Sequence, residues 1–474
     1  TVKRVVPREN EAINETWISD RDRFSYEGIY SDERLMSPMI KKDDQWQEIS
    51  WKDALIEIVE KLKVVEKNSA AVLASPNSTL EEFYLLSRLS DELSISNIDH
   101  RLRMVDFTDQ LNDPKIPLLG MNIAEIENCK QIVVVGSDIR KEAPIIGHRI
   151  RKAALSGAQI GIINENINEY FFDVAVYLSE SIIGNLLGLL SALNGEPPEE
   201  MRDIFKQIKP TKEQQKLAAI LNSKDKKHLI LGHLAINHPY ASVIRLLSAK
   251  IAELTGAVLG FITEGSNAAG GHLMGVLPHR GFAGSSQEII GHSISEISEN
   301  NLDLLLLFNA EPGKDIPSLS AEKLTDSLVI ALTPYATENY KTTADIMLPI
   351  GTFAETSGTY INCEESWQSF SGIANPVGES RPGWKVLRAI GSLLGMSEFE
   401  FESSESVLDE ISQRLKDTPM SNEINNFSLQ NKIKEKDLLG THLVHRVPMY
   451  EVDSVLRHSA SLQLTPEASR SDST

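Results

Sequence analysis

Apolar and polar positions alternate with two periods along most of the chain, one typical of helices and one typical of buried strands. A helical period predicts a helix over Lys52–Lys63, and a short apolar run predicts a strand over Ala70–Ala74. Ser78 and Glu81 have the spacing of a helix-capping pair, which predicts a second helix ending near Leu93. Because helix and strand signals alternate, the pattern favours an α/β fold.

The clearest strand–helix–strand unit covers Gln131–Asn164. A fully apolar strand at Ile132–Val135 is followed by a helix at Ile145–Leu155 and by a second strand at Ile160–Ile163. Such a unit implies parallel strands joined by a right-handed crossover. Similar apolar runs predict further buried strands at His228–Leu231, Leu302–Phe308 and Leu328–Leu332.

The pattern changes after about Gly395. Acidic and serine residues become frequent there, no strand-like run follows, and Thr465–Thr474 has the composition of a disordered end. Weaker breaks fall at Asn194–Glu199, which contains two prolines, and at the glycine-rich Gly265–Gly284. We therefore expect a polar C-terminal tail over 396–474.

Composition narrows the possible functions. The 474 residues correspond to about three domains, and 41% apolar with 24% charged residues is typical of a globular protein. The apolar runs are interrupted or too short to span a bilayer. The chain has 47 basic and 67 acidic residues, giving a net charge of −20. This charge argues against a nucleic-acid-binding surface and against electrostatic binding to anionic lipid.

Residues able to bind a metal are scarce. Cys129 and Cys363 are the only cysteines, so they supply neither a disulfide framework nor the four thiolates of an iron–sulfur site, and a reducing compartment is expected. His233 and His238 lack a metal-ligand spacing, and no G-x-S-x-G nucleophile motif occurs. Because the first residue is Thr1 rather than Met, we expect the chain to be part of a longer protein.

Two loops are candidates for ligand contacts. The loop over 136–144 joins a strand to a helix, and backbone amides near Gly136 and Ser137 could hold a phosphate. The alternative is an ordinary turn, since the loop lacks a G-x-G-x-x-G or P-loop pattern. The glycine-rich segment over 265–272, which includes Asn267 and Gly271, is either a ligand loop or a structural loop.

Three groups of segments occur in an order and spacing that resemble one protein family. They are Trp17–Gly28 with Ser50–Leu55, then Val133–Pro144, and finally Ala344–Pro349 with Gly358–Asn362 and Gly378–Trp384. Together they resemble the molybdopterin oxidoreductase superfamily. Within it they are most similar to the large iron–sulfur subunit of respiratory NADH:quinone oxidoreductase (complex I), which is called the 75 kDa subunit in mitochondria and has a bacterial counterpart.

The resemblance implies a fold and a domain organisation. The implied fold is α/β of the formate dehydrogenase/DMSO reductase-like type, with interleaved Rossmann-like parallel sheets. The implied domains are 1–48 as the remainder of an N-terminal iron–sulfur-associated region, 49–119 with 263–395 as one discontinuous α/β domain, 120–262 as an inserted Rossmann-like domain, and 396–474 as the tail.

The resemblance also implies that inorganic groups are absent from this chain. Ser19 stands where some relatives carry a cluster-ligating cysteine, and Arg101 stands where catalytic relatives ligate molybdenum or tungsten. A guanidinium offers no lone pair to a metal, and the neighbouring His100 does not follow the family's ligand pattern. After Gly395 too few residues remain for the domain that covers the pterin in catalytic relatives. We therefore expect no catalytic residue, metal or cofactor here, with iron–sulfur clusters in the region before Thr1 and vestigial cofactor contacts at Gly136, Ser137, Asn267 and Gly271.

The implied function is that of a scaffold in the peripheral arm of complex I, whose large iron–sulfur subunit takes part in electron transfer from NADH to quinone in the respiratory chain. Its partners would be other peripheral-arm subunits, without nucleic acid and without insertion into the membrane. The location would be the cytoplasmic side of the bacterial inner membrane or the mitochondrial matrix side. One alternative is an active pterin- and molybdenum-dependent oxidoreductase. Another is an independent nucleotide-binding protein, which the missing glycine fingerprint disfavours.

Overall fold

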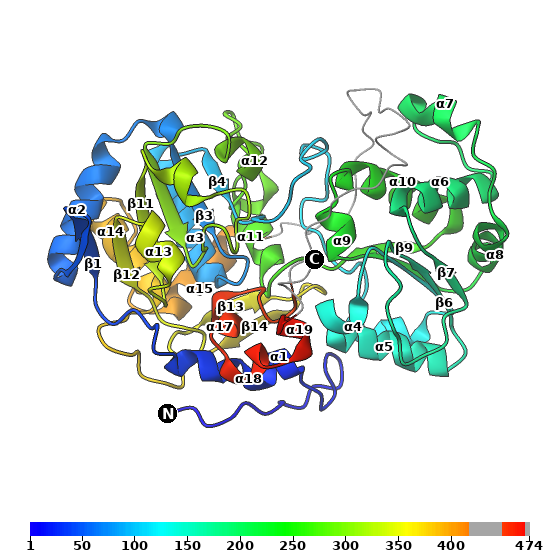
Figure 1. Ribbon diagram of the computed structural model, residues 1–474, viewed down its shortest axis with the longest axis horizontal. Coiled ribbons are helices and arrows are strands. Elements are labelled where there is room, and N and C mark those ends of the chain that lie inside the picture. The colour runs from blue at the N-terminus through cyan, green and yellow to red at the C-terminus, as the bar shows by residue number, and fades with distance from the viewer. Residues whose placement is uncertain (417–447, 470–474) are drawn as a thin grey trace.

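Two β-sheets covered by helices form the two lobes of the molecule (Figure 1). The computed structural model describes residues 1–416 and 448–469. Within these residues the larger sheet has seven strands and the smaller sheet has five. The α/β class with parallel sheets that the sequence predicts is confirmed.

The larger sheet is parallel over five neighbouring strands and ends in an antiparallel pair. In the centre, Leu306 is in register with Val72 on one side and with Ile330 on the other. The central strand is apolar at every position because both faces of the sheet are covered. In spatial order the strands are β2 (Gln45–Glu48), β1 (Met39–Lys42), β12 (Ile346–Pro349), β11 (Leu328–Thr333), β10 (Leu304–Phe308), β3 (Ala70–Ala74) and β4 (Asn97–Asp99).

Each face of the larger sheet has its own apolar core. On one face Val72 and Leu306 pack among residues of three long helices, and on the other Leu73 and Leu305 pack among residues of short ones. The long helices are α2 (Trp51–Val64), α3 (Leu80–Leu93) and α14 (Gly383–Leu394), and the short ones are α12 (Ile294–Ile297) and α13 (Glu338–Thr343). A hairpin of β13 (Gly358–Ile361) and β14 (Trp367–Phe370) lies against α3.

The start of α3 differs by one residue from the prediction. The capping box is made by Thr79 and Glu82, not by Ser78 and Glu81. Both pairs fit the sequence pattern equally, so local sequence leaves the choice open. Tertiary contacts decide it, because the Glu81 carboxylate accepts hydrogen bonds from the backbone N–H and hydroxyl of Thr359, at 2.9 and 2.8 Å.

The smaller sheet is parallel throughout and confirms the predicted strand–helix–strand unit. Two apolar cores, one on each face, bury its strands beneath helices. In spatial order the strands are β7 (Val176–Leu178), β6 (Gln159–Ile163), β5 (Gln131–Val135), β8 (Lys227–Leu231) and β9 (Val258–Phe261). The helices are η3 (Ile123–Asn128), α5 (Pro144–Leu155), α6 (Ile182–Ala192), α8 (Lys212–Leu221) and α10 (Ala241–Thr255).

The segment expected as a polar tail is folded against the body wherever the structure describes it. Phe399, Val407 and Ile411 are buried in the core beside α3 and α14, and α15 (Ser404–Arg414) carries two of them. A few apolar residues are enough to hold this segment in place, because α3 and α14 already provide an apolar surface against which they pack. Further along, α17 (Ser454–Arg457), α18 (Ala460–Gln463) and α19 (Pro466–Ser469) follow one another, so part of the end expected to be disordered is helical. Residues 470–474 lie outside the described residues.

The N-terminal segment contacts these last helices. It forms α1 (Asp20–Phe24) and η1 (Ser25–Tyr30), which contact α17 and α18 (Figure 1). Short helical turns connect the remaining elements: η2 (Lys67–Ser69), α4 (Ile139–Glu142), η4 (Glu199–Met201), α7 (Arg202–Phe205), α9 (His233–Ile236), α11 (Ala268–Met274), η5 (Phe282–Gly284) and η6 (Ala321–Leu324). No helix among the described residues has the length and apolar character needed to cross a bilayer.

Candidate functional site

A cavity of about 380 Å³ lies between the two lobes. The larger sheet lines it with residues that follow the carboxyl ends of its strands, such as Asn309 after β10 and Ile350 after β12. The smaller sheet contributes His233 after β8 and Thr263 after β9. The crevice at the carboxyl ends of parallel strands is where open α/β proteins bind ligands. This cavity is therefore the candidate site.

Acidic side chains outnumber basic ones around the cavity. Glu82, Glu142, Glu264 and Asp453 line it, whereas Arg21, Arg103 and His233 are the basic residues among its lining. Arg103 is already paired with Asp315 and Glu264, at 3.0 and 3.8 Å between nitrogen and oxygen. Burial raises the pKa of both Glu82 and Asp453. These two carboxyls therefore favour the neutral form, and with Arg103 already paired the cavity lining presents no excess of positive charge that would attract an anionic ligand.

A carboxylate of the chain itself, that of Glu142, accepts three donors at the first predicted loop and at the start of α9. Glu142 Oε2 accepts hydrogen bonds from the Ser137 hydroxyl at 2.5 Å and from the His233 backbone N–H at 3.1 Å. Its other oxygen accepts the Asp138 backbone N–H at 2.9 Å. These are the groups that would hold a phosphate at the start of a helix. These three donors are therefore already bonded to Glu142.

Gly136 has a structural reason to be glycine. Its φ of +59° lies in the left-handed region, and a Cβ there would come within 2.6 Å of the Ala235 backbone nitrogen. The loop therefore packs against α9 at Gly136, while Glu142, near the end of the loop, lines the cavity. Neither Gly136 nor Ser137 lines the cavity, and Ser137 is fully buried.

Asn267 and Gly271 of the glycine-rich segment are also held by internal contacts, and residues 268–274 form the helix α11 rather than the loop that the sequence suggested. The Asn267 side chain is fully buried, donates to the Ser78 carbonyl at 2.8 Å and accepts from the Ile361 N–H at 2.8 Å. A Cβ at Gly271 would lie 2.8 Å from the His100 ring. Gly265 and Ser266, just before them, do line the cavity. The loop thus contributes to the site through its first residues.

The position expected for a metal ligand holds a buried ion pair. Arg101 Nη2 lies 2.8 Å from Asp99 Oδ2, and the guanidinium lies over the Phe107 ring. The neighbouring His100 bonds the Val276 carbonyl through Nδ1 at 2.8 Å, and burial lowers its pKa to about 4. Among the described residues, no group of three or more His, Cys, Asp or Glu side chains is placed to hold a metal ion.

The remaining ligand candidates have other roles. Ser19 is the N-cap of α1, where its hydroxyl oxygen accepts the Asp22 backbone N–H at 3.1 Å. Burial raises the pKa of the Cys129 thiol, and burial raises that of Cys363 to about 12. Both shifts favour the neutral thiol in the folded protein.

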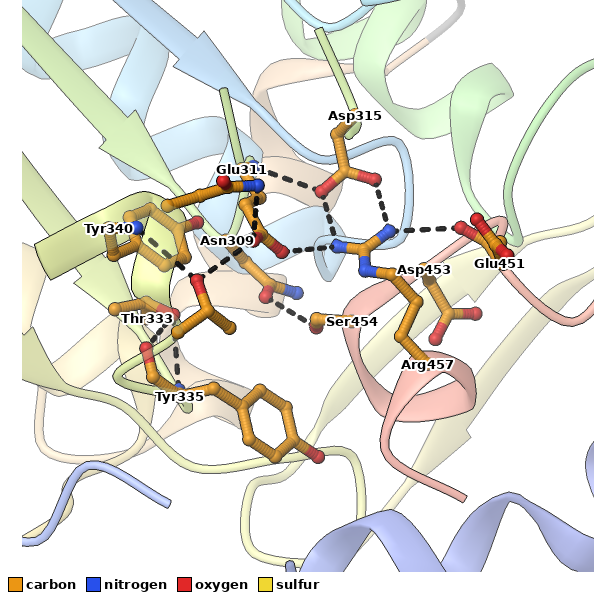
Figure 2. A network of polar contacts seen from close by, with 12 residues as sticks. Asn309, Glu311, Asp315, Thr333, Tyr335, Tyr340, Glu451, Asp453, Ser454 and Arg457 are labelled. Carbon is orange, nitrogen blue, oxygen red and sulfur yellow. Dashed lines mark hydrogen bonds and ion pairs between the residues drawn. The ribbon is translucent and has the colours of Figure 1, made fainter. Parts of the chain in front are cut away.

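Sequence reasoning missed the residues that reach this edge from the C-terminal end. Arg457 of α17 lies between Asp315 and Glu311, with nitrogen–oxygen distances of 2.9 and 3.1 Å (Figure 2). Ser454 donates to the Asn309 side chain at 2.9 Å. The sequence signal for this helix is a capping aspartate, Asp453, followed by one arginine, Arg457. So short a pattern cannot be distinguished from chance.

The residues around the cavity do not fit a metal-bound pterin group, which the resemblance associates with this crevice. Such a group carries phosphate, yet Glu142 already takes the amide donors of the loop. Residues 452–456 of the chain line the same cavity. Arg101 cannot ligate a metal and its charge is matched by Asp99.

Known proteins similar to this chain agree on its family. The molybdopterin oxidoreductase model matches residues 34–393, and the model of the NADH-ubiquinone oxidoreductase NDSU1/NuoG-like 4Fe-4S domain matches residues 1–27. Residues 1–27 contain no cysteine. The second match therefore shows kinship of this segment without supplying thiolate ligands.

Two relatives are named as subunits of an NADH:quinone oxidoreductase. The mitochondrial NADH-ubiquinone oxidoreductase 78 kDa subunit of Candida albicans is 26% identical over 83% of this chain and 49% of its own length. An NADH-quinone oxidoreductase subunit of Rickettsia felis is 24% identical over 98% of this chain and 63% of its own length. The chain thus spans about half to two thirds of these relatives.

A solved structure shares the fold. Acetylene hydratase from Pelobacter acetylenicus superposes with a TM-score of 0.61 at 12% identity, over 88% of this chain and 70% of that one. At this identity the likeness concerns the fold alone. Since the family model covers most of the chain, the protein belongs to the molybdopterin oxidoreductase family.

Proposed function

We propose that this chain is a scaffold portion of the large iron–sulfur subunit of an NADH:quinone oxidoreductase and carries no redox centre of its own. Its family and its similarity to subunits of such oxidoreductases support the assignment to such a complex. In that role the chain takes part in electron transfer from NADH to quinone without performing chemistry.

One observation above all supports the proposed absence of a redox centre. The Glu142 carboxylate fills the place of an anion between Ser137, Asp138 and the start of α9. A second anion in the same place would be repelled by a charge at hydrogen-bond distance. The Arg101–Asp99 pair at the expected ligand position points the same way.

The proposal extends to organisation and surroundings. Residues 49–119 with 263–395 would form one discontinuous domain, and 120–262 an inserted one. The iron–sulfur clusters would lie in a region preceding the segment that matches the 4Fe-4S domain model, and the partners would be other peripheral-arm subunits. The complex would place the chain at the cytoplasmic face of a bacterial inner membrane, or on the matrix side in mitochondria.

Elemental analysis of the purified full chain tests the proposal. We expect molybdenum, tungsten and iron far below one atom per chain, and no fluorescent pterin after acid extraction. Stoichiometric metal or pterin would contradict it and would favour the alternative, an active pterin-dependent oxidoreductase. The cavity between the carboxyl ends of the two sheets is the observation that favours this alternative.

A further inference from the structure

We propose that residues 448–469, here called the C-terminal strap, clamp the N-terminal segment 19–30 onto the carboxyl edge of the larger sheet, with Arg457 as the anchor. The strap leads from the edge of the cavity to α1 and η1. Its use, to keep an attached electron-transfer region in a fixed position, rests on the proposed scaffold function. The clamp itself does not depend on that function.

The anchor is a buried, two-pronged ion pair. Arg457 Nη1 and Nη2 each donate to one oxygen of Asp315, both at 2.9 Å, and Nη2 also donates to Glu311 at 3.1 Å (Figure 2). The side chains of Arg457, Asp315 and Glu311 are at most 9% exposed. Burial alone would raise the pKa of Asp315, but the charge and hydrogen bonds of Arg457, together with the charge of Arg103 and the Glu311 N–H, lower it overall. This paired geometry holds the strap at a defined point.

The body is built to receive a cation at this point. Glu311 Oε1 accepts from the Thr337 hydroxyl at 2.8 Å, and Asp315 Oδ2 accepts from the Glu311 backbone N–H at 2.9 Å. These contacts fix both carboxylates without help from the strap. Arg103 supplies one positive charge to Asp315 at 3.0 Å. Without Arg457, two buried carboxylates would face one cation, so the site needs the charge that the strap brings.

Beyond the anchor, the strap grips the N-terminal segment. Ser461 bonds both oxygens of Glu27, through its N–H at 2.7 Å and its hydroxyl at 2.6 Å. The Ser459 hydroxyl donates to the Phe24 carbonyl at 2.9 Å. These contacts join positions more than 430 residues apart in the sequence. The strap therefore closes the chain into a loop at this edge.

The N-terminal segment lies between the strap and the sheet. The Tyr335 hydroxyl donates to the Gly28 carbonyl at 2.8 Å, while a Cβ at Gly28 would lie 2.3 Å from the Val455 carbonyl oxygen. The His458 ring stacks on Tyr335 with 3.7 Å between ring centroids. Only glycine permits this approach of the two backbones. The segment consequently cannot leave the sheet unless the strap moves first.

Hydrogen–deuterium exchange of the full chain tests the clamp with the variant Arg457→Gln. We expect amides in 449–463 and in 24–30 to exchange about tenfold faster or more, with α2 unchanged. The matched control is Arg202→Gln, whose partner Glu199 is exposed and 3.9 Å away; it should leave both segments as in the wild type. Unchanged exchange in 24–30 would overturn the clamp, whether or not the strap itself exchanges faster.

A second variant covers the case in which Arg457→Gln unfolds the chain, shown by faster exchange in α2 as well. Glu27→Gln changes only the contact between Glu27 and Ser461, which lies away from Arg457 and involves a partly exposed carboxylate. Faster exchange of the amides in 459–463 and 24–30 is expected, and wild-type rates there would overturn the proposal. Because this measurement involves neither metal content nor partner binding, failure of the clamp is distinguishable from failure of the scaffold function.

Discussion

Arg34 and Glu355 form a buried ion pair, with 2.8 Å between Nη2 and Oε2, that joins the chain just after the N-terminal segment to the loop after β12. Arg34 also donates to the carbonyls of Ile29 and Pro334, at 2.7 and 3.1 Å. One side chain thus connects the N-terminal segment, the end of β11 and the end of β12. The pair fixes the same edge of the sheet that the strap covers.

Removing the Arg34 charge should therefore destabilise the larger lobe strongly. In Arg34→Met the Glu355 carboxylate stays buried without its cation, and we expect a loss of about 3–5 kcal/mol in the free energy of unfolding. The control Lys206→Met, whose pair with Asp203 is exposed, should cost less than about 0.5 kcal/mol. Urea unfolding followed by tryptophan fluorescence measures this, since all five tryptophans lie outside the smaller sheet. Equal stability of both variants would contradict the prediction.

Acid should destabilise the protein through its buried histidines. Burial lowers the pKa of His100 to about 4, so the folded protein keeps it neutral while the unfolded chain protonates it below its ordinary value of 6.5. The unfolded state then binds more protons, and stability falls as the pH drops from about 6.5 toward 4. For His100 the loss reaches about 3 kcal/mol at pH 4.

The variant His100→Asn tests this pH dependence. The Asn amide can keep the hydrogen bond to the Val276 carbonyl but does not titrate. Urea unfolding at several pH values between 7 and 4 should show a shallower loss of stability than in the wild type. An unchanged slope would assign the acid sensitivity to the other buried histidines, His228, His272 and His279, and not to His100.

Glu81 should change the pH dependence of stability in the opposite direction to His100. Burial raises its pKa to about 7, so the folded state favours the protonated carboxyl, and its contribution to stability is lost as the pH rises from about 4.5 through 7. Glu81→Gln removes this titration, and we expect stability to decline less between pH 5 and 8 than in the wild type. Glu57→Gln, at a partly exposed site on α2, should retain the wild-type profile. The comparison uses the same unfolding measurement.

Glu142→Ala should uncover an anion site. The variant frees the Ser137 hydroxyl and the Asp138 and His233 amides, which now bond to the carboxylate. We expect inorganic phosphate to bind this variant weakly, with Kd on the order of 1 mM, and to raise its melting temperature. Wild type and Glu196→Ala, an exposed change in the same lobe, should show no such shift. Phosphate stabilisation of all three proteins alike would show that Glu142 does not block the site.

The local sequence was sufficient to predict the positions of the strands and of most helices that were expected. The fully apolar runs at Ile132–Val135 and Leu328–Leu332 become buried parallel strands, because a strand covered on both faces has to be apolar throughout. Boundaries shifted by one or two residues where tertiary contacts compete, as at the start of α3. The first candidate loop does follow a strand as expected, whereas most of the glycine-rich segment is the helix α11; the Ser137 and Asn267 side chains are bonded internally.

What the sequence determined by itself is the order of apolar strands and amphipathic helices, together with the chemical limits set by two cysteines and an arginine at position 101. Only the tertiary structure decided that Glu142 accepts hydrogen bonds from Ser137, Asp138 and His233, and that Arg457 pairs with Asp315, 142 positions earlier in the chain. Periodicity reports which residues are buried, since burial follows local geometry. It carries no information on which buried charges pair, because that depends on chain segments brought together by folding.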